Sequence, residues 1–212
     1  MNKSTFATSI ILDAAKKGTT IAYFALEDDP KDVTKRILIQ CEMNEELATK
    51  ILDNILFMPE SKGYTLPEMS EAIEKIFKIA DIVVVDPLQF IFEASEVGKG
   101  ESEFNRQRTF MRDMNTVMKH TNKTLIIVSH TNKGDGKQVK VGLDKIIGSS
   151  AVAQVSTKAI EIGRDSEGVQ HIQLWKNRFS YYRFNPIQVE LDNMKIRTNY
   201  TQEDMKQLRL QW

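Results

Sequence analysis

The pattern of apolar and polar positions divides the chain into two parts of different character. In the first part, amphipathic segments alternate with short apolar runs that are typical of strands buried on both faces of a sheet. The apolar runs predict strands at residues 21–26, 54–58, 81–85 and 124–129. The segments between them predict helices at residues 5–17, 30–41, 45–52, 67–79 and 103–120. This alternation predicts an α/β fold with a mainly parallel sheet.

The second part consists of short apolar runs joined by brief turns. These runs predict antiparallel strands added to the edge of the sheet, at residues 157–162, 169–176, 184–191 and 195–198. Thr201 begins a capping signal for a short final helix. Because no internal repeat or Pro/Gly/Ser-rich linker is present, we expect one domain over 1–212. It would comprise a parallel core (1–130), a loop with the edge strands (131–198) and a tail helix (199–212).

The composition indicates the cellular environment of the protein more clearly than its function. The 29 lysine and arginine residues offset the 29 aspartate and glutamate residues, so any contact with nucleic acid must be local. The single cysteine, Cys41, cannot form an internal disulfide and fits a reducing, cytoplasmic location. The apolar stretch at 6–12 is followed by charged residues and by no cleavage signal, and no run is long enough to span a membrane.

The segment Asn2-Lys3-Ser4-Thr5 has the pattern of the second half of a phosphate-binding P-loop. In such a loop the lysine reaches the β- and γ-phosphate oxygens, and the hydroxyl holds Mg²⁺. Asn2 occupies the position where glycine is expected, and the first glycine of the pattern is absent. The alternative is a frayed N-terminus in which Ser4 or Thr5 caps the first helix.

Three predicted strands end in polar residues, and ligand groups collect at such ends in open α/β sheets. Glu27 follows a buried strand and is well placed to accept a proton from an attacking water, although acids also favour helix N-termini. Asp86 ends four apolar residues, as in a Walker B strand that holds Mg²⁺ through water. His130 can hydrogen-bond a γ-phosphate, or it is a capping or surface histidine.

Two basic groups complete the candidate residues. Lys176 and Arg178 lie near the end of a predicted antiparallel strand, where a guanidinium could reach a neighbouring subunit's γ-phosphate; the alternative is a solvated basic turn. A glycine-containing loop offers a contact for a phosphate backbone, or is simply a solvated surface loop. Its lysines are Lys133, Lys137, Lys140 and Lys145.

In this order, the segments resemble the RecA-like ATPase core of the DnaB-like hexameric replicative helicases, with phage primase-helicases and mitochondrial Twinkle as relatives. The resemblance runs from Asn2 to about Leu191. It implies a RecA-like P-loop NTPase sheet, the cofactors ATP and Mg²⁺, single-stranded DNA as partner and a homo-hexameric ring. It also implies the following site residues: catalytic Glu27, His130 and, acting in trans, Arg178; nucleotide-binding Asn2, Lys3, Ser4, Thr5 and Lys176; metal-binding Ser4 and Asp86; and DNA-binding Lys133, Lys137, Lys140 and Lys145.

The chain departs from this family at its beginning. Family members have a strand before the P-loop, inside the parallel sheet, and that first strand is missing here. Removing an internal strand leaves unpaired backbone groups on both neighbouring strands, unless the sheet closes the gap or another segment fills it. We therefore expect a fragment of a longer reading frame, with a natural truncated relative as the alternative. The interrupted P-loop also predicts weak nucleotide binding. The alternatives to a helicase motor are a non-hydrolysing RecA-fold module for assembly or DNA binding, and a recombinase-like or regulatory ATPase that does not unwind DNA.

Overall fold

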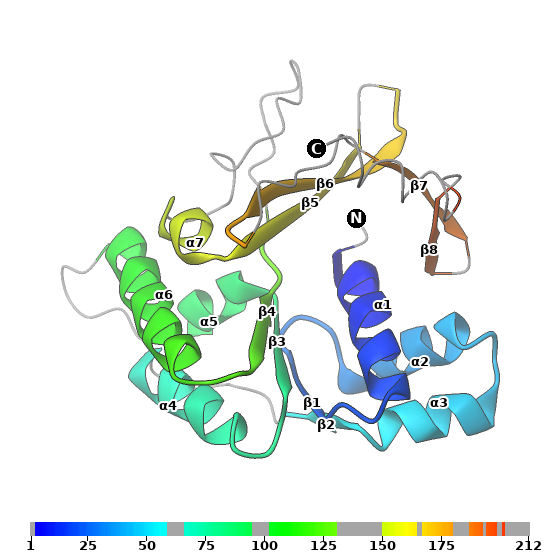
Figure 1. Cartoon of the computed structure of the whole chain (residues 1–212), viewed down its shortest axis with the longest axis horizontal. Coiled ribbons are helices and arrows are strands. Elements are labelled where there is room, and N and C mark those ends of the chain that lie inside the picture. Colours follow the sequence, from blue (N-terminus) through cyan, green and yellow to red (C-terminus); the bar gives the residue numbers. More distant parts are fainter. Residues whose placement is uncertain are drawn as a thin grey trace.

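The computed structural model contains two four-stranded sheets (Figure 1). The residues it describes are 3–58, 66–94, 102–130, 150–164, 167–179, 187–192, 194–198 and 201. The first sheet is parallel, with the strand order β2-β1-β3-β4. Its strands are β1 (Ile21–Ala25), β2 (Ile55–Phe57), β3 (Ile82–Asp86) and β4 (Thr124–Ile127).

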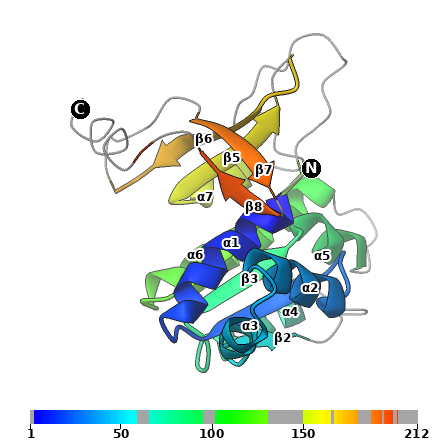
Figure 2. The same cartoon turned by 90° about the vertical axis from the view of Figure 1, so that its right-hand side faces the viewer.

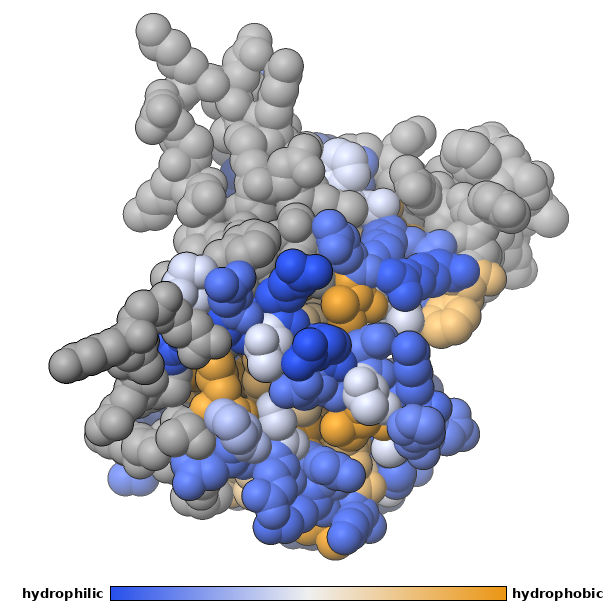
Figure 3. Space-filling view, turned by 90° about the vertical axis from the view of Figure 1, so that its left-hand side faces the viewer, coloured by the Kyte–Doolittle hydropathy of each residue, from blue (hydrophilic) through white to orange (hydrophobic). Residues whose placement is uncertain are grey.

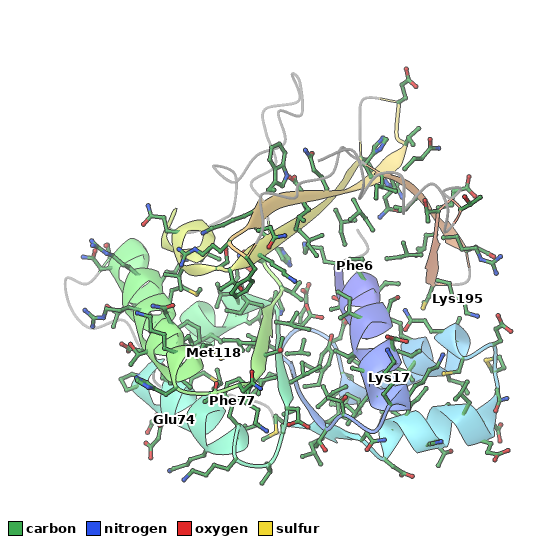
Figure 4. All side chains as sticks on the ribbon, in the orientation of Figure 1. Phe6, Lys17, Glu74, Phe77, Met118 and Lys195 are labelled. Atoms are coloured by element: carbon green, nitrogen blue, oxygen red, sulfur yellow. The ribbon has the colours of Figure 1, made fainter. Side chains whose placement is uncertain are left out.

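Helices cover both faces of the parallel sheet (Figures 1 and 2). One face packs against α1 (Lys3–Lys16), α2 (Pro30–Gln40) and α3 (Glu45–Leu52). The other packs against α4 (Leu66–Ile76), α5 (Leu88–Ala94) and α6 (Glu103–Lys119). Phe77 and Met118, labelled in Figure 4, belong to this second cluster. Because the sheet is covered on both sides, β1 and β3 are apolar along nearly their whole length.

The helix boundaries follow from local chemistry. Asp29 caps α2 by accepting a hydrogen bond from the Lys31 amide at 2.7 Å, and Pro30 occupies the first helical position. Asn44 caps α3 in the same way, through the Leu47 amide at 2.9 Å. Gly18 ends α1 in the left-handed region, with φ of 83°, which a residue with a Cβ rarely adopts.

The second sheet is antiparallel and lies beside the N-terminal end of α1. Its strands are β5 (Lys158–Arg164), β6 (Gln170–Asn177), β7 (Ile187–Asp192) and β8 (Lys195–Arg197). Phe6 of α1 packs against the small apolar cluster of this sheet, and Figure 4 shows it on the side of α1 that is nearest to these strands. The opposite side of α1 packs against the parallel sheet, so the helix lies between the two.

The structure confirms the predicted α/β class, the parallel strands and the antiparallel C-terminal strands. The antiparallel strands, however, form their own sheet instead of extending the parallel one. Within the described residues, β4 pairs only with β3, and its side chains are more exposed than those of β1. The position of an additional strand beside β4 is therefore not taken by any described segment.

Two helices were not predicted. α5 follows β3 almost directly and is too apolar to show an amphipathic period, and α7 (Ser150–Val155) has only six residues and no charged group. The predicted tail helix has no described residue except Thr201.

Figure 3 shows the face formed largely by α4 and α6. Its described residues are mostly hydrophilic, with hydrophobic residues visible only as small separate groups. Across the described ranges, none of the helices combines the length and apolar character needed to cross a membrane.

Candidate active site

The carboxyl ends of β1, β3 and β4 meet at one edge of the parallel sheet. Ala25 is in register with Asp86, and Val85 is in register with Ile127. The ladder continues past the strands, because the Leu26 amide donates to the carbonyl oxygen of Asp86 at 2.9 Å. The residues that follow these strands therefore lie close together, as the sequence predicted.

The first turn of α1 delivers Lys3 and Ser4 to this edge. The Ser4 hydroxyl hydrogen-bonds to the carboxyl group of Asp86. Lys3 is half-buried, and burial lowers the pKa of its ammonium group, while the nearby carboxylates of Asp86 and Glu27 act in the opposite direction. Ser4 and Thr5 lie inside the helix rather than at its cap, so the capping alternative does not describe them.

Asp86 is a buried carboxyl group, only 6% exposed. It accepts a hydrogen bond from the Tyr23 hydroxyl, with 2.6 Å between the phenol oxygen and Oδ2. Burial raises the pKa of Asp86, and the hydrogen bonds from Tyr23 and Ser4 partly offset this effect. Burial, together with the neighbouring Asp86, also raises the pKa of Tyr23 far above its usual value, which keeps the phenol protonated as a donor.

Glu27 and His130 form a second contact at the same edge. His130 Nε2 lies 3.5 Å from Glu27 Oε2, and the contact is an ion pair when the imidazole is protonated. The side chains are 49% and 38% exposed for Glu27 and His130, so water reaches both. Glu27 thus contacts an imidazole and its charge acts on the ammonium of Lys3, in an open part of the site.

Gln89 connects the segments that follow β3 and β4. Its amide nitrogen donates to Ser129 Oγ at 2.9 Å, and its Oε1 accepts from the His130 amide at 3.2 Å. These bonds hold the backbone that carries the imidazole. The sequence pattern did not single out Gln89.

Arg36 is a further residue that the sequence pattern did not single out. Its guanidinium pairs with Asp28 at 2.8 Å, and its Nη1 atom is buried without a hydrogen-bond partner among the described residues. The positive charge acts to lower the pKa of Asp86, while Asp28 acts to raise it. Because Arg36 lies in the middle of α2, only the packing of that helix brings it near the site.

Lys176 lies at the end of β6, and Arg178 lies in the turn that follows it. Both donate to the main-chain carbonyl oxygen of Gln154 at the end of α7, with a distance of 2.8 Å for Lys176. Burial, and to a smaller extent the charge of Arg178, lowers the pKa of Lys176. Action on a neighbouring subunit stays a prediction, because one chain is present.

The remaining predicted residues fall into two groups. Thr5 is buried in α1, where its carbonyl oxygen accepts bonds from Thr8, Ser9 and Gln40. The other predicted residues lie outside the described part of the chain: Asn2, Lys133, Lys137, Lys140 and Lys145.

The oxygen atoms at this edge of the sheet are suited to a magnesium ion that binds together with a nucleotide. Among the described residues, no group of three or more His, Cys, Asp or Glu side chains is arranged to hold a metal by itself. Mg²⁺ usually takes one or two protein oxygens together with water and phosphate oxygens. The Ser4 hydroxyl beside the Asp86 carboxyl offers such a pair, and the Lys3 ammonium lies next to it.

The fold is of the RecA-like α/β class, and the candidate site lies at the carboxyl ends of its parallel strands. The model of the AAA domain family matches residues 2–136, which is more than half of the chain. The chain therefore belongs to the AAA domain family. A comparison with curated protein sequences finds no match.

Solved structures of low sequence identity share the fold. One is an ATPase domain, with a TM-score of 0.73 and 14% identity, covering 94% of this chain and 81% of the other. A second is the structure of a DnaB-like replicative helicase and its interactions with primase. Its TM-score is 0.73 at 14% identity, and the match covers 92% of this chain and 54% of the helicase chain. A KaiC-like protein from the archaeon Pyrococcus horikoshii OT3 has a TM-score of 0.67 and 15% identity, with coverages of 94% and 84%.

Proposed function

We propose that the chain is the ATP-hydrolysing motor core of a DnaB-like DNA helicase acting in replication. The observation that carries the proposal is the bond from the Ser4 hydroxyl to the Asp86 carboxyl group, with Lys3 and Glu27 beside it. These residues come from α1, β3 and the end of β1, so their convergence depends on the fold and not on local sequence. The fold shared with a DnaB-like helicase supports the same assignment.

Each residue has a distinct part in the proposed hydrolysis. Lys3 binds the β- and γ-phosphates, and its partial burial strengthens that electrostatic contact. Ser4 and Asp86 hold the magnesium ion, directly and through water. A magnesium ion held by these residues would supply positive charge against the phosphate oxygens. Glu27 accepts the proton of the attacking water, and the partial exposure of its side chain admits that water.

His130 is placed to respond to the nucleotide. Its imidazole contacts Glu27, and its backbone is held by Gln89, next to the Asp86 segment. A γ-phosphate that bonds to the imidazole would draw it away from Glu27. Its loss would then be transmitted to residues 131–149, which follow His130 and carry the proposed DNA-binding lysines.

The proposal includes the assembly and the partner. The chain would act as a ring on single-stranded DNA in the cytoplasm, with Arg178 and Lys176 reaching the neighbouring subunit's nucleotide. To do so, both basic groups would exchange the Gln154 carbonyl oxygen for phosphate oxygens. Arginine pairs well with phosphate because its guanidinium donates two parallel hydrogen bonds.

A second candidate is a regulatory or recombinase-like ATPase that does not unwind DNA. The shared fold with a KaiC-like protein favours it, since the match to that structure covers 94% of this chain and the match to the DnaB-like helicase covers 92%. Both candidates use the same nucleotide site. They differ in the response to DNA.

The test is ATP hydrolysis by the full chain with and without single-stranded DNA. Glu27→Gln keeps the shape of the side chain and removes the base, so we expect kcat to fall by about 10²–10⁴-fold with nucleotide binding retained. Glu74→Gln, on the exposed surface of α4, is the matched control and should hydrolyse ATP normally.

The outcomes separate the candidates. Stimulation by single-stranded DNA supports the helicase motor. Equal rates with and without DNA argue for the second candidate. An absence of hydrolysis in the wild-type chain contradicts both and leaves a non-hydrolysing module.

A further inference from the structure

The hydroxyl of Tyr23 is a polar group in the middle of an apolar strand. All five side chains of β1 are buried, and Tyr23 is 0% exposed. Its ring packs near that of Phe57, with 6.1 Å between the ring centroids. A phenylalanine would fill this place without a hydroxyl that needs a buried partner. Packing alone therefore does not account for a tyrosine here.

The parallel register brings this hydroxyl to Asp86. Tyr23 is paired with Val84, so Asp86 lies two residues further along β3 and on the same face of the sheet. An aromatic side chain is long enough to span that diagonal, and the phenol donates to Oδ2 at 2.6 Å. This length is typical of a charge-assisted O–H···O⁻ bond, which is roughly twice as strong as a neutral hydrogen bond.

Asp86 is thus held from two elements, by Tyr23 from the sheet and by Ser4 from α1. The terminal torsion of an aspartate is broad, so a carboxylate without such bonds turns freely. We infer that Tyr23 is a positioning residue for the metal-binding carboxylate: its phenol holds Oδ2 and thereby directs Asp86 toward the magnesium ion of a bound nucleotide. The inference rests on the proposed nucleotide site and adds to it the group that orients the carboxylate.

The test measures metal binding rather than turnover. Mn²⁺ binding to the full chain is followed by electron paramagnetic resonance in the presence of a non-hydrolysable ATP analogue. Tyr23→Phe should weaken Mn²⁺ binding by about tenfold, since losing a hydrogen-bond partner of a metal ligand typically costs 10–100-fold in affinity. Binding of a fluorescent ATP analogue in EDTA should stay unchanged, because the hydroxyl acts only through the metal.

Two further variants distinguish positioning from packing. Phe57→Leu alters the contacts of the same ring but keeps the phenol, and it should bind Mn²⁺ as the wild type does. In an Asp86→Asn background, removal of the Tyr23 hydroxyl should have no additional effect on Mn²⁺ affinity. Circular dichroism checks that each variant is folded.

Three results would overturn the inference. Wild-type Mn²⁺ affinity in Tyr23→Phe would show that the bond does not matter for the metal. An equal loss in Phe57→Leu would show a packing effect. A wild-type chain that binds neither the analogue nor Mn²⁺ would refute the nucleotide site itself, and that result is seen before any variant is compared.

Discussion

At the scale of single residues, Lys3 combines a positive charge with partial burial. The ammonium group is desolvated at the start of α1 and is balanced by the carboxylates of Asp86 and Glu27. Desolvation makes an electrostatic contact stronger than it is in water, and a phosphate would replace solvent at this end of the helix. Lys17, just past the other end of α1, is 72% exposed and pairs with Asp13 at 2.8 Å.

The two lysines make a matched pair for mutagenesis. Lys3→Met should weaken ATP binding by about 10–100-fold, because a hydrogen bond to a charged group contributes about 1.5–3 kcal/mol. Lys17→Met should leave ATP binding unchanged, since its ion pair is exposed and at the far end of α1. Equilibrium binding of a fluorescent ATP analogue measures both, and an equal loss in the two variants would contradict a specific role for Lys3.

At the scale of elements, Gln40 joins three parts of the fold. Its side-chain nitrogen contacts the Thr5 carbonyl oxygen at 3.1 Å, Ser9 Oγ at 3.0 Å and the Met194 carbonyl oxygen at 2.9 Å. These contacts connect the end of α2 to the first turns of α1 and to the turn before β8. Lys195, labelled in Figure 4, adds an ion pair to Glu42 between the same regions. α1 is therefore held at the end that carries Lys3 and Ser4.

We expect the Gln40→Met variant to be less stable than the wild type. The substitution keeps the length of the side chain but removes its bonds to Thr5, Ser9 and Met194. A typical hydrogen bond contributes about 0.5–1.5 kcal/mol to the free energy of unfolding. Urea unfolding measures the loss. Gln188→Met, at an exposed position of β7, is the control and should unfold as the wild type does. Equal midpoints for both variants would show that Gln40 does not connect these elements.

At the scale of the whole molecule, two sheets are joined through α1. Apolar residues of α1 pack into the cluster of the parallel sheet, while Phe6 packs into the cluster of the antiparallel sheet. Lys176 and Arg178 are carried by β6 and the turn after it, where both donate to the carbonyl oxygen of Gln154. The proposed ring has them contact the nucleotide of a neighbouring copy.

Mixing two inactive variants tests this arrangement. Glu27→Gln lacks the base and Arg178→Ala lacks the guanidinium, so each variant alone should hydrolyse little ATP. A ring assembled from an equal mixture has intact sites at about a quarter of its interfaces, where Glu27 of one copy meets Arg178 of another. The ATPase rate of the mixture should therefore exceed that of either variant. A rate no higher than their average would contradict action in trans.

Much of the fold followed from local patterns. The strands at 21–26 and 81–85 are predictable because a short, unbroken run of apolar residues in a polar chain indicates a strand buried on both faces. α2 is predictable from Pro30 and its acidic neighbours. α5 and α7 escape prediction because they are short and carry no amphipathic period. Their formation depends on packing against α6 and on the end of β3 rather than on propensity.

In the candidate site, too, some features follow from local sequence and others from the tertiary structure. The sequence by itself determined the α/β class and the residues at the strand ends, Glu27, Asp86 and His130, because strand periodicity and the position of a polar residue after an apolar run are local properties. Only the tertiary structure decided that Tyr23 bonds to Asp86, that Gln89 holds His130 and that α1 brings Ser4 to the same carboxyl group. Those contacts depend on the register of strands and on helix packing between distant segments, which no local pattern encodes.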